Sequence, residues 1–270
     1  MLQQSFTSQR PAMLTPPNPH APRGPFVTFV GAGPGAAQHL TLGAYHALCG
    51  ADVVIHDRLV GPEVLALIPA QTPSVDVGKE GFGAQTAQAD INAAIVAHAS
   101  KGAHVVRLKG GDTGIFGRLD EEISALEGAG IAYAIQPGLT AASAAAAAIG
   151  QSLTQRGRNA PLRILTGHDM AGFADQDWRG LAQSGTVAAI YMGKKSARFI
   201  QGRLLMHGAV ADTPVTLVEN VSRQDQRIIA CTLATFAAHA ATLSGPAVIL
   251  LGLSPRAAIQ HIPSLQEAQA

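Results

Sequence analysis

The stretch PFVTFVGAGPG, residues 25–35, determines the fold class of this 270-residue chain. The β-branched and aromatic residues from Phe26 to Val30 end in closely spaced glycines, as a buried strand does where it enters a tight turn. LTLGAYHALCGA at 40–51 then predicts a helix, and ADVVIHD at 51–57 predicts a second strand. Strand, helix and strand in succession are typical of a parallel sheet.

The same alternation continues through the first half of the chain. PEVLALI begins at Pro62 and reads as a helix opened by proline. Later helices are predicted in QADINAAIVAHASKG, EEISALEGAG and TAASAAAAAIG, and later strands in AHVVRLKGGD and IAYAIQPG. We therefore predict an α/β fold whose parallel sheet is covered by helices on both faces.

A polar stretch divides the chain. Residues 150–160 read as a linker between an N-terminal α/β domain at 26–149 and a C-terminal α/β domain at 161–254. The second domain has strands in LRILTGH, TVAAIYMG, TPVTLVENV and PAVILLG, and RIIACTLATF reads as a strand followed by a helix. These strands are closely spaced, so we predict a mixed second sheet. Residues 1–25 are predicted to be a disordered tail, since they are rich in Pro, Gln, Ser and Thr, and 255–270 a second tail.

Charge and composition exclude several classes of protein. Lys and Arg number 19 against 18 Asp and Glu, so no excess of positive charge is present to bind nucleic acid through its phosphates. The apolar stretches are too short for a membrane helix, and we predict a soluble, cytoplasmic protein. The two cysteines lie far apart and the ten histidines show no metal-ligand spacing, so neither a disulfide nor a metal site is predicted.

The first glycine turn partly fits the fingerprint of a dinucleotide site. Gly31, Gly33 and Ala36 occupy its three small-residue positions, and Asp57 ends the next strand. Pro34, however, stands where a phosphate-binding turn needs a backbone N–H that proline lacks. A plain strand-to-helix turn remains an alternative reading.

A second glycine turn follows another strand. Lys109-Gly110-Gly111-Asp112 comes directly after HVVRL, at a position where a dinucleotide-binding domain needs no such turn. Open α/β sheets bind ligands at the carboxyl ends of their strands. Two such turns indicate one small molecule bound by several loops. Asp112 could accept hydrogen bonds from that ligand or only cap the next turn.

Taken together and in order, the motifs are specific. VGAGPG, DRLV, VGK, RLKGGD, IFGR with EE, PGLTAAS, YMG and GPAVILLG closely resemble the uroporphyrinogen-III C-methyltransferases over about residues 26–254. The resemblance implies S-adenosylmethionine-dependent methylation of two pyrrole carbons, giving precorrin-2 for sirohaem, cobalamin and haem d1 synthesis. It also implies two α/β domains with an active-site cleft between them, of the tetrapyrrole methylase type and not the Rossmann type of methyltransferase, and a homodimer.

The resemblance implies which residues contact the methyl donor, S-adenosylmethionine, and its product, S-adenosylhomocysteine. Most of them would do so through their backbone. They are Pro34, Gly110, Gly111, Asp112, Ile115, Thr140, Ala141, Met192, Val221, Pro246 and Ala247. The family usually has glycine or alanine at the position of Val221, and core packing is the alternative role of Met192.

The resemblance also marks Asp57 as proton acceptor and Lys79 as proton donor. A pyrrole carbon that attacks the methyl group builds positive charge on its ring and must later lose a proton. A carboxylate can stabilise that charge and accept the proton. A lysine acid needs a lowered pKa, so pairing with a substrate carboxylate is the alternative role of Lys79, and capping a strand is that of Asp57.

A tetrapyrrole substrate with eight carboxylates requires local cations. Arg58, Lys79 and Arg118 lie in matched motifs and are predicted to bind those carboxylates, since guanidinium groups do so with two hydrogen bonds. Glu121 would orient Arg118. Surface arginines without a role in binding are the alternative for each.

Two segments depart from the family pattern and leave alternatives open. Thr113-Gly114 stand where Pro-Phe is usual, and Leu119-Asp120 replace two glycines. One alternative is therefore a methyltransferase of this fold that acts on a later corrinoid precursor or another acceptor. Another is an inactive relative that still binds its ligand. The first glycine turn leaves a third alternative open, a nicotinamide-dependent oxidoreductase.

Overall fold

The computed structural model describes residues 25–78, 87–159, 161–169 and 172–257. Two compact units emerge from the contacts: the first runs to Gly138 without residues 33–36, and the second combines 33–36 with Leu139 onward. The unit boundary thus precedes the alanine-rich helix, whereas the predicted linker lies at 150–160. Residues 1–24 of the tail predicted at 1–25, and most of the tail predicted at 255–270, fall outside the described residues.

The first unit has a five-stranded sheet in the order β3-β2-β4-β1-β5, with all neighbours parallel. The strands are β1 (Phe26–Gly31), β2 (Val53–His56), β3 (Ser74–Asp76), β4 (His104–Lys109) and β5 (Ala132–Gln136). The helices are η2 (Ala37–His39), α1 (Leu42–Cys49), α2 (Pro62–Leu65), α3 (Gln88–Ala99) and α4 (Leu119–Gly128). The predicted parallel sheet is confirmed.

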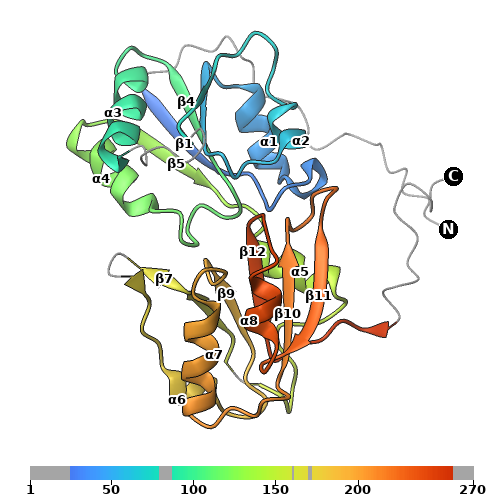
Figure 1. Cartoon of the computed structure of the whole chain (residues 1–270). Coiled ribbons are helices and arrows are strands. Elements are labelled where there is room, and N and C mark those ends of the chain that lie inside the picture. The colour runs from blue at the N-terminus through green and yellow to red at the C-terminus, as the bar shows by residue number, and fades with distance from the viewer. Residues whose placement is uncertain (1–24, 79–86, 160, 170–171, 258–270) are drawn as a thin grey trace, which may run out of the picture. The chain divides into compact units, whose positions relative to one another are not determined.

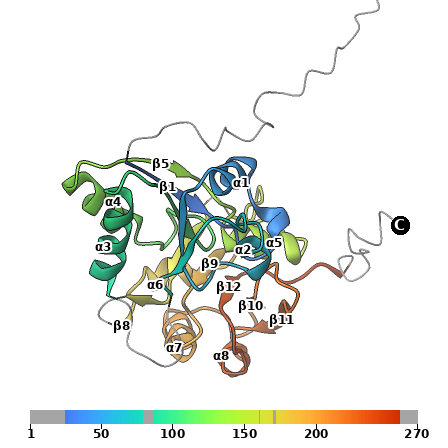
Figure 2. The ribbon, with the colours of Figure 1, turned by 90° about the horizontal axis from the view of Figure 1, so that it is seen from above.

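Helices cover both faces of this sheet because successive side chains of each buried strand point to opposite faces. Val27 and Phe29 of β1 pack with the cluster under α3 and α4, whereas Val30 packs with the cluster under α1 and α2. Figure 1 and Figure 2 both show α3 and α4 side by side, away from α1. Helices thus hold the sheet on both faces, and the loops that contain the predicted glycine turns follow the carboxyl ends of its strands.

The second unit has a five-stranded sheet in the order β11-β10-β12-β9-β6. Only β6 and β9 run parallel, and the other neighbours are antiparallel, which confirms the predicted mixed sheet. Its strands are β6 (Arg163–Thr166), β9 (Ala188–Tyr191), β10 (Pro214–Glu219), β11 (Arg227–Thr232) and β12 (Ala247–Leu251), and β7 (His168–Asp169) and β8 (Gly172–Phe173) form a separate pair.

Helices also cover both faces of the second sheet. The helices are α5 (Ala141–Ala148), α6 (Trp178–Leu181), α7 (Ala197–Met206) and α8 (Phe236–Ala240). One face packs against α6, α7 and α8, and the other against the small side chains of α5. Across the described part of the chain, no helix is long and apolar enough to cross a membrane.

Candidate functional site

Three glycine turns meet at the carboxyl edge of the first sheet. A Cβ atom added at Gly31 would lie 2.5 Å from the Gly138 Cα atom and 2.8 Å from the Gly111 carbonyl oxygen. Real Cβ atoms do not approach so closely, so the backbones at the ends of β1, β4 and β5 pack directly on each other. The predicted ligand-binding turns, Gly110-Gly111 among them, therefore lie at one edge.

Asp112 ties two of these turns together. Its Oδ1 atom accepts a hydrogen bond from the Gly114 N–H at 2.9 Å, and its Oδ2 atom accepts one from the Gly138 N–H at 2.9 Å. The cap foreseen as an alternative is thus present. An ionised carboxylate has about four acceptor positions, so Asp112 retains capacity to bind a ligand hydroxyl or amine.

Asp57 follows β2 at the same edge and contacts a buried arginine. The Arg107 guanidinium donates a hydrogen bond to the Asp57 Oδ1 atom. The Arg107 side chain is 1% exposed, whereas that of Asp57 is 31% exposed. The buried Arg107 guanidinium thus fixes the Asp57 carboxylate, which stays partly accessible to solvent.

Arg107 belongs to a buried ion network. The Glu122 Oε1 atom accepts hydrogen bonds from Arg107 Nη2 at 3.0 Å and from Lys109 Nζ at 2.8 Å. Burial lowers the pKa of Lys109, and the nearby Arg107 charge lowers it further, against the opposing effects of Glu122 and Asp57. With two cations and two carboxylates, the network compensates its own charge, which buried ions require.

Arg118 and Glu121 form an exposed ion pair. Arg118 Nε donates to Glu121 Oε1 at 2.7 Å and Arg118 Nη2 to Oε2 at 2.6 Å, and the hydrogen bond from Arg118 lowers the pKa of Glu121. Their side chains are 55% and 52% exposed. Glu121 therefore fixes the direction of the Arg118 guanidinium.

The remaining predicted residues of the first unit vary in their surroundings. Arg58 is exposed, and a Cβ atom at Gly78 would lie 2.4 Å from the Arg58 Cβ atom, so their two loops are in contact. Ile115 is half-buried, and its N–H donates to the Asp112 carbonyl at 3.3 Å. Lys79 lies outside the described residues.

The departures from the family pattern have ordinary structural roles. Thr113 is 1% exposed, and Leu119 packs against the core beneath α3 and α4. Asp120 is exposed in the first turn of α4, where a carboxylate interacts favourably with the helix dipole. The added negative charge thus points to solvent.

The second unit brings together Thr140, Ala141 and Met192. The Tyr191 hydroxyl lies 2.5 Å from the Thr140 hydroxyl oxygen and accepts a hydrogen bond from the Ala142 N–H at 2.7 Å. Met192 follows Tyr191 with φ of 52° and is 51% exposed. Because its side chain is half outside the core, simple core packing does not account for Met192.

Pro34 and Val221 lie on neighbouring loops of the second unit. The Ala36 N–H donates to the Ser222 hydroxyl at 3.0 Å, and a Cβ atom at Gly35 would lie 3.1 Å from the Val221 carbonyl oxygen. The Val221 side chain is 5% exposed and packs in the core. A ligand would therefore meet Val221 through its backbone.

Glu219 is the last residue of β10 and pairs with Ala247 of β12. This register places Pro246 and Ala247 beside the loop that follows β10 and contains Val221. Burial alone would raise the pKa of Glu219. Hydrogen bonds from the Gly245 and Ser244 N–H groups and the charge of Arg227 outweigh burial, so the pKa lies below its ordinary value. Glu219 is therefore a buried anion beside two predicted donor contacts.

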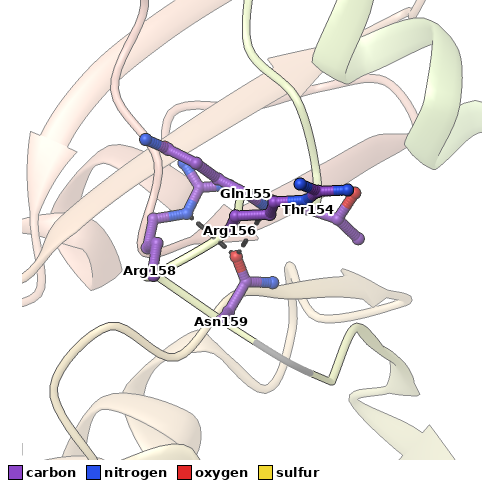
Figure 3. A pocket seen from close by; sticks show the side chains of 6 residues that line it. Thr154, Gln155, Arg156, Arg158 and Asn159 are labelled. Carbon is purple, nitrogen blue, oxygen red and sulfur yellow. Dashed lines mark hydrogen bonds between the residues drawn. The ribbon is translucent and has the colours of Figure 1, made fainter.

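Sequence reasoning missed a pocket in the predicted linker. An open surface pocket of about 660 Å³ is lined by Thr154, Gln155, Arg156, Gly157, Arg158 and Asn159. Figure 3 shows two hydrogen bonds to the Asn159 Oδ1 atom, one from the Arg158 Nε atom at 3.0 Å and one from the Gln155 backbone N–H at 3.3 Å. The two arginines flanking Gly157 were the available signal.

Arg107 and Glu122 were also missed. Arg107 lies inside the apolar run HVVRLK, and a charge in such a strand is itself a signal of a buried partner. Within the described ranges, no group of three or more His, Cys, Asp or Glu residues could hold a metal ion.

Comparisons with known proteins agree on one family. The sequence model described as Tetrapyrrole (Corrin/Porphyrin) Methylases matches residues 27–237. A siroheme synthase of Edwardsiella ictaluri is 43% identical over 226 residues, which are 84% of this chain and 49% of that protein. Siroheme synthase 3 of Aeromonas hydrophila is also 43% identical over 226 residues, 84% of this chain and 48% of that protein. The chain thus spans about half the length of these relatives.

Solved structures give the same result. Uroporphyrin-III C-methyl transferase from Thermus thermophilus, in complex with S-adenyl homocysteine, has a TM-score of 0.72 and 35% identity, with 84% of this chain and 96% of that chain covered. A cobalt precorrin-4 methyltransferase has a TM-score of 0.76 at 23% identity over 86% of this chain and 98% of that chain, a likeness of fold alone.

Proposed function

Because the chain belongs to the tetrapyrrole (corrin/porphyrin) methylase family, we propose that it methylates uroporphyrinogen III with S-adenosylmethionine as donor. The products are precorrin-1 and then precorrin-2, for sirohaem, cobalamin or haem d1 synthesis. The observation that carries this proposal is Asp57, an accessible carboxylate held by buried Arg107 beside the glycine turns. The similar Thermus thermophilus enzyme, named for this reaction and holding S-adenyl homocysteine, supports it.

The eleven residues predicted to contact the donor suit that ligand. S-adenosylmethionine supplies an electrophilic methyl group on a sulfonium sulfur. Asp112 has acceptor capacity left for a hydroxyl or amine of the donor, and Thr140 offers a hydroxyl already fixed by Tyr191. Exposed Met192 offers apolar surface. A nucleoside joined to an amino acid needs both polar acceptors and apolar surface, and the two units each supply groups of these kinds.

Asp57 serves the acceptor in this proposal. A pyrrole carbon forms a bond to the methyl carbon while the methyl–sulfur bond breaks, and its electron pair stays on sulfur. Positive charge appears on the pyrrole ring, and the fixed Asp57 carboxylate stabilises it. The proton then leaves the methylated ring system to Asp57 or to water, which restores the neutral product.

Cations at the same edge would bind the substrate's carboxylates. Arg118 presents a guanidinium whose direction Glu121 fixes, and Arg58 is exposed beside the Asp57 loop. Lys79 is proposed either to pair with a carboxylate or to donate a proton. Lys79→Ala separates these roles, because loss of pairing raises the KM for the tetrapyrrole and loss of proton transfer lowers kcat.

The homodimer and the cytoplasmic location remain proposals, as do the absence of nucleic-acid and membrane partners. They rest on the family resemblance and on the near-neutral charge of the chain.

The proposed function is tested by anaerobic incubation of the protein with S-adenosylmethionine and uroporphyrinogen III. Mass spectrometry of the tetrapyrrole is expected to show two added methyl groups. If the protein binds the donor but leaves uroporphyrinogen III unmethylated, the acceptor is a different one or the activity is lost. If it does not bind the donor, the assignment of the donor site is wrong.

A further inference from the structure

Two charged residues of the second unit have no role in the function proposed above. Met192 follows β9, Val221 follows β10 and Pro246 precedes β12, so three loops each carry a predicted donor contact. Lys194 lies two residues after Met192, and Glu219 two residues before Val221. Both side chains bind the third loop, at Ser244 and Gly245.

Glu219 binds the N–H groups of that loop. Its Oε1 atom accepts hydrogen bonds from the Ser244 N–H at 2.6 Å and the Gly245 N–H at 2.5 Å, and its Oε2 atom pairs with Arg227 at 3.0 Å. The Glu219 side chain is 1% exposed. Burying a carboxylate is unfavourable unless such donors compensate it, so its placement depends on this turn.

Lys194 binds the carbonyl groups of the same two residues. Its Nζ atom donates to the Ser244 oxygen at 2.9 Å and to the Gly245 oxygen at 3.1 Å. The N–H and C=O groups of both residues are therefore held by two side chains of opposite charge. Hydrogen bonds to charged groups are about twice as strong as those between neutral groups.

The next residue, Pro246, is a predicted donor contact and is held by a further hydrogen bond. The Asn220 N–H donates to the Pro246 carbonyl at 2.9 Å. A Cβ atom at Gly245 would lie 2.2 Å from the Asn220 Oδ1 atom, so the two loops are in direct contact there. The Pro246 carbonyl is therefore held by Asn220, and the two residues before it are held by Lys194 and Glu219.

We propose that Lys194 and Glu219 are positioning residues for the methyl donor, because together they fix the Ser244–Gly245 turn and thereby Pro246 and Ala247. This inference rests on the proposed function, since it takes these two residues as donor contacts. Lys194 is only half-buried, and one of the two residues that it binds, Ser244, is exposed. Its loss should therefore affect donor binding far more than folding.

The chain offers a matched control for Lys194. Lys195 is the next residue, has the same charge and is exposed. Lys194→Met and Lys195→Met remove the same charge from adjacent positions, so an effect of net charge on donor binding is common to both. Lys194→Arg retains two donors for the two carbonyls.

The test is calorimetric titration of the full chain and its variants with S-adenosylhomocysteine. We expect Lys194→Met to raise the Kd about tenfold, as loss of charge-assisted hydrogen bonds does, with Lys195→Met and Lys194→Arg within about twofold of wild type. Melting temperatures measured without ligand should agree among the four proteins. Equal Kd values for Lys194→Met and Lys195→Met would overturn the inference.

Glu219 is tested by a second pair of variants. Glu219→Gln retains an oxygen that accepts both N–H groups, so its Kd should stay within a few-fold of wild type, whereas Glu219→Ala should raise the Kd more than Lys194→Met does. If Glu219→Ala does not fold, the Lys194 series still decides. A wild-type protein that does not bind S-adenosylhomocysteine would instead contradict the proposed function itself.

Discussion

The carboxyl edge of the first sheet and the loops of the second unit are built in different ways. The first presents charged side chains, and the buried network of Arg107, Lys109 and Glu122 supports Asp57. The second carries predicted donor contacts on three loops, and Lys194 and Glu219 bind the backbone of one of them. The side chains predicted to serve the acceptor, Asp57, Arg58 and Arg118, thus belong to the first unit, whereas the second unit supplies predicted donor contacts. Substitutions in the two regions should have different consequences.

The largest effect is expected from removing the charge of the first region. Asp57→Asn keeps the size of the side chain but removes the anion that stabilises the ring cation and accepts a proton. We expect turnover of uroporphyrinogen III to fall about 10²- to 10⁴-fold, measured from the methylated product by mass. Asp90→Asn, at an exposed position in the first turn of α3, is the control and should retain wild-type turnover.

Breaking the buried network should have the next largest effect. Arg107→Met removes one of the two cations that pair with buried Glu122 and leaves Lys109 as the other. It also removes the ion pair between Arg107 and Asp57. We expect a loss of about 3–5 kcal/mol in the free energy of unfolding, measured with urea. The matched control is Arg118→Met, which breaks an exposed pair that solvent already screens and should change stability far less. Similar losses for both variants would show that burial does not distinguish the two pairs.

A smaller effect is expected at Asp112, where a side chain of the first region supports backbone. Asp112→Ala removes the acceptors of the Gly114 and Gly138 N–H groups and loosens the glycine turns. We expect the Kd for S-adenosylmethionine to rise about tenfold by calorimetry. Unchanged affinity would remove Asp112 from the donor site.

The smallest effect concerns the second region and pH. The pKa of Glu219 is lowered in the folded protein, so the unfolded chain binds its proton more readily. Its contribution to stability is complete above the unfolded value of about 4.3 and is lost as the pH falls through the folded value. The stability difference between wild type and Glu219→Gln should be constant from about pH 5 to 7 and shrink below about pH 4. A stability difference that grows as the pH falls would mean that folding raises the pKa of Glu219.

Much of the fold followed from hydrophobic patterning. The parallel first sheet and the mixed second sheet were predicted, because buried strands such as FVTFVG and AVILL are short apolar runs bounded by turn residues. The strand β3 was missed, since SVD is short, largely exposed and lacks such a pattern. PEVLALI gave a helix of only four residues, Pro62–Leu65.

The family was predicted correctly, but the supporting contacts were not. The ordered motifs identified the tetrapyrrole methylases, as the comparisons confirm. Motifs name residues that are predicted to face a ligand, such as Asp57 and Asp112. Arg107, Glu122, Lys194 and Glu219 act through contacts between segments distant in sequence. Only the folded chain brings Lys194 to Ser244, 50 residues later.

The central claim is that Asp57 serves the methyl acceptor and not the methyl donor. Its most direct test is the affinity of Asp57→Asn for S-adenosylhomocysteine, measured by calorimetry beside the wild type. If Asp57 serves the acceptor, the variant should bind this ligand within about twofold of wild type while its turnover is lost. Loss of donor affinity in proportion to the loss of turnover would contradict the role assigned to Asp57.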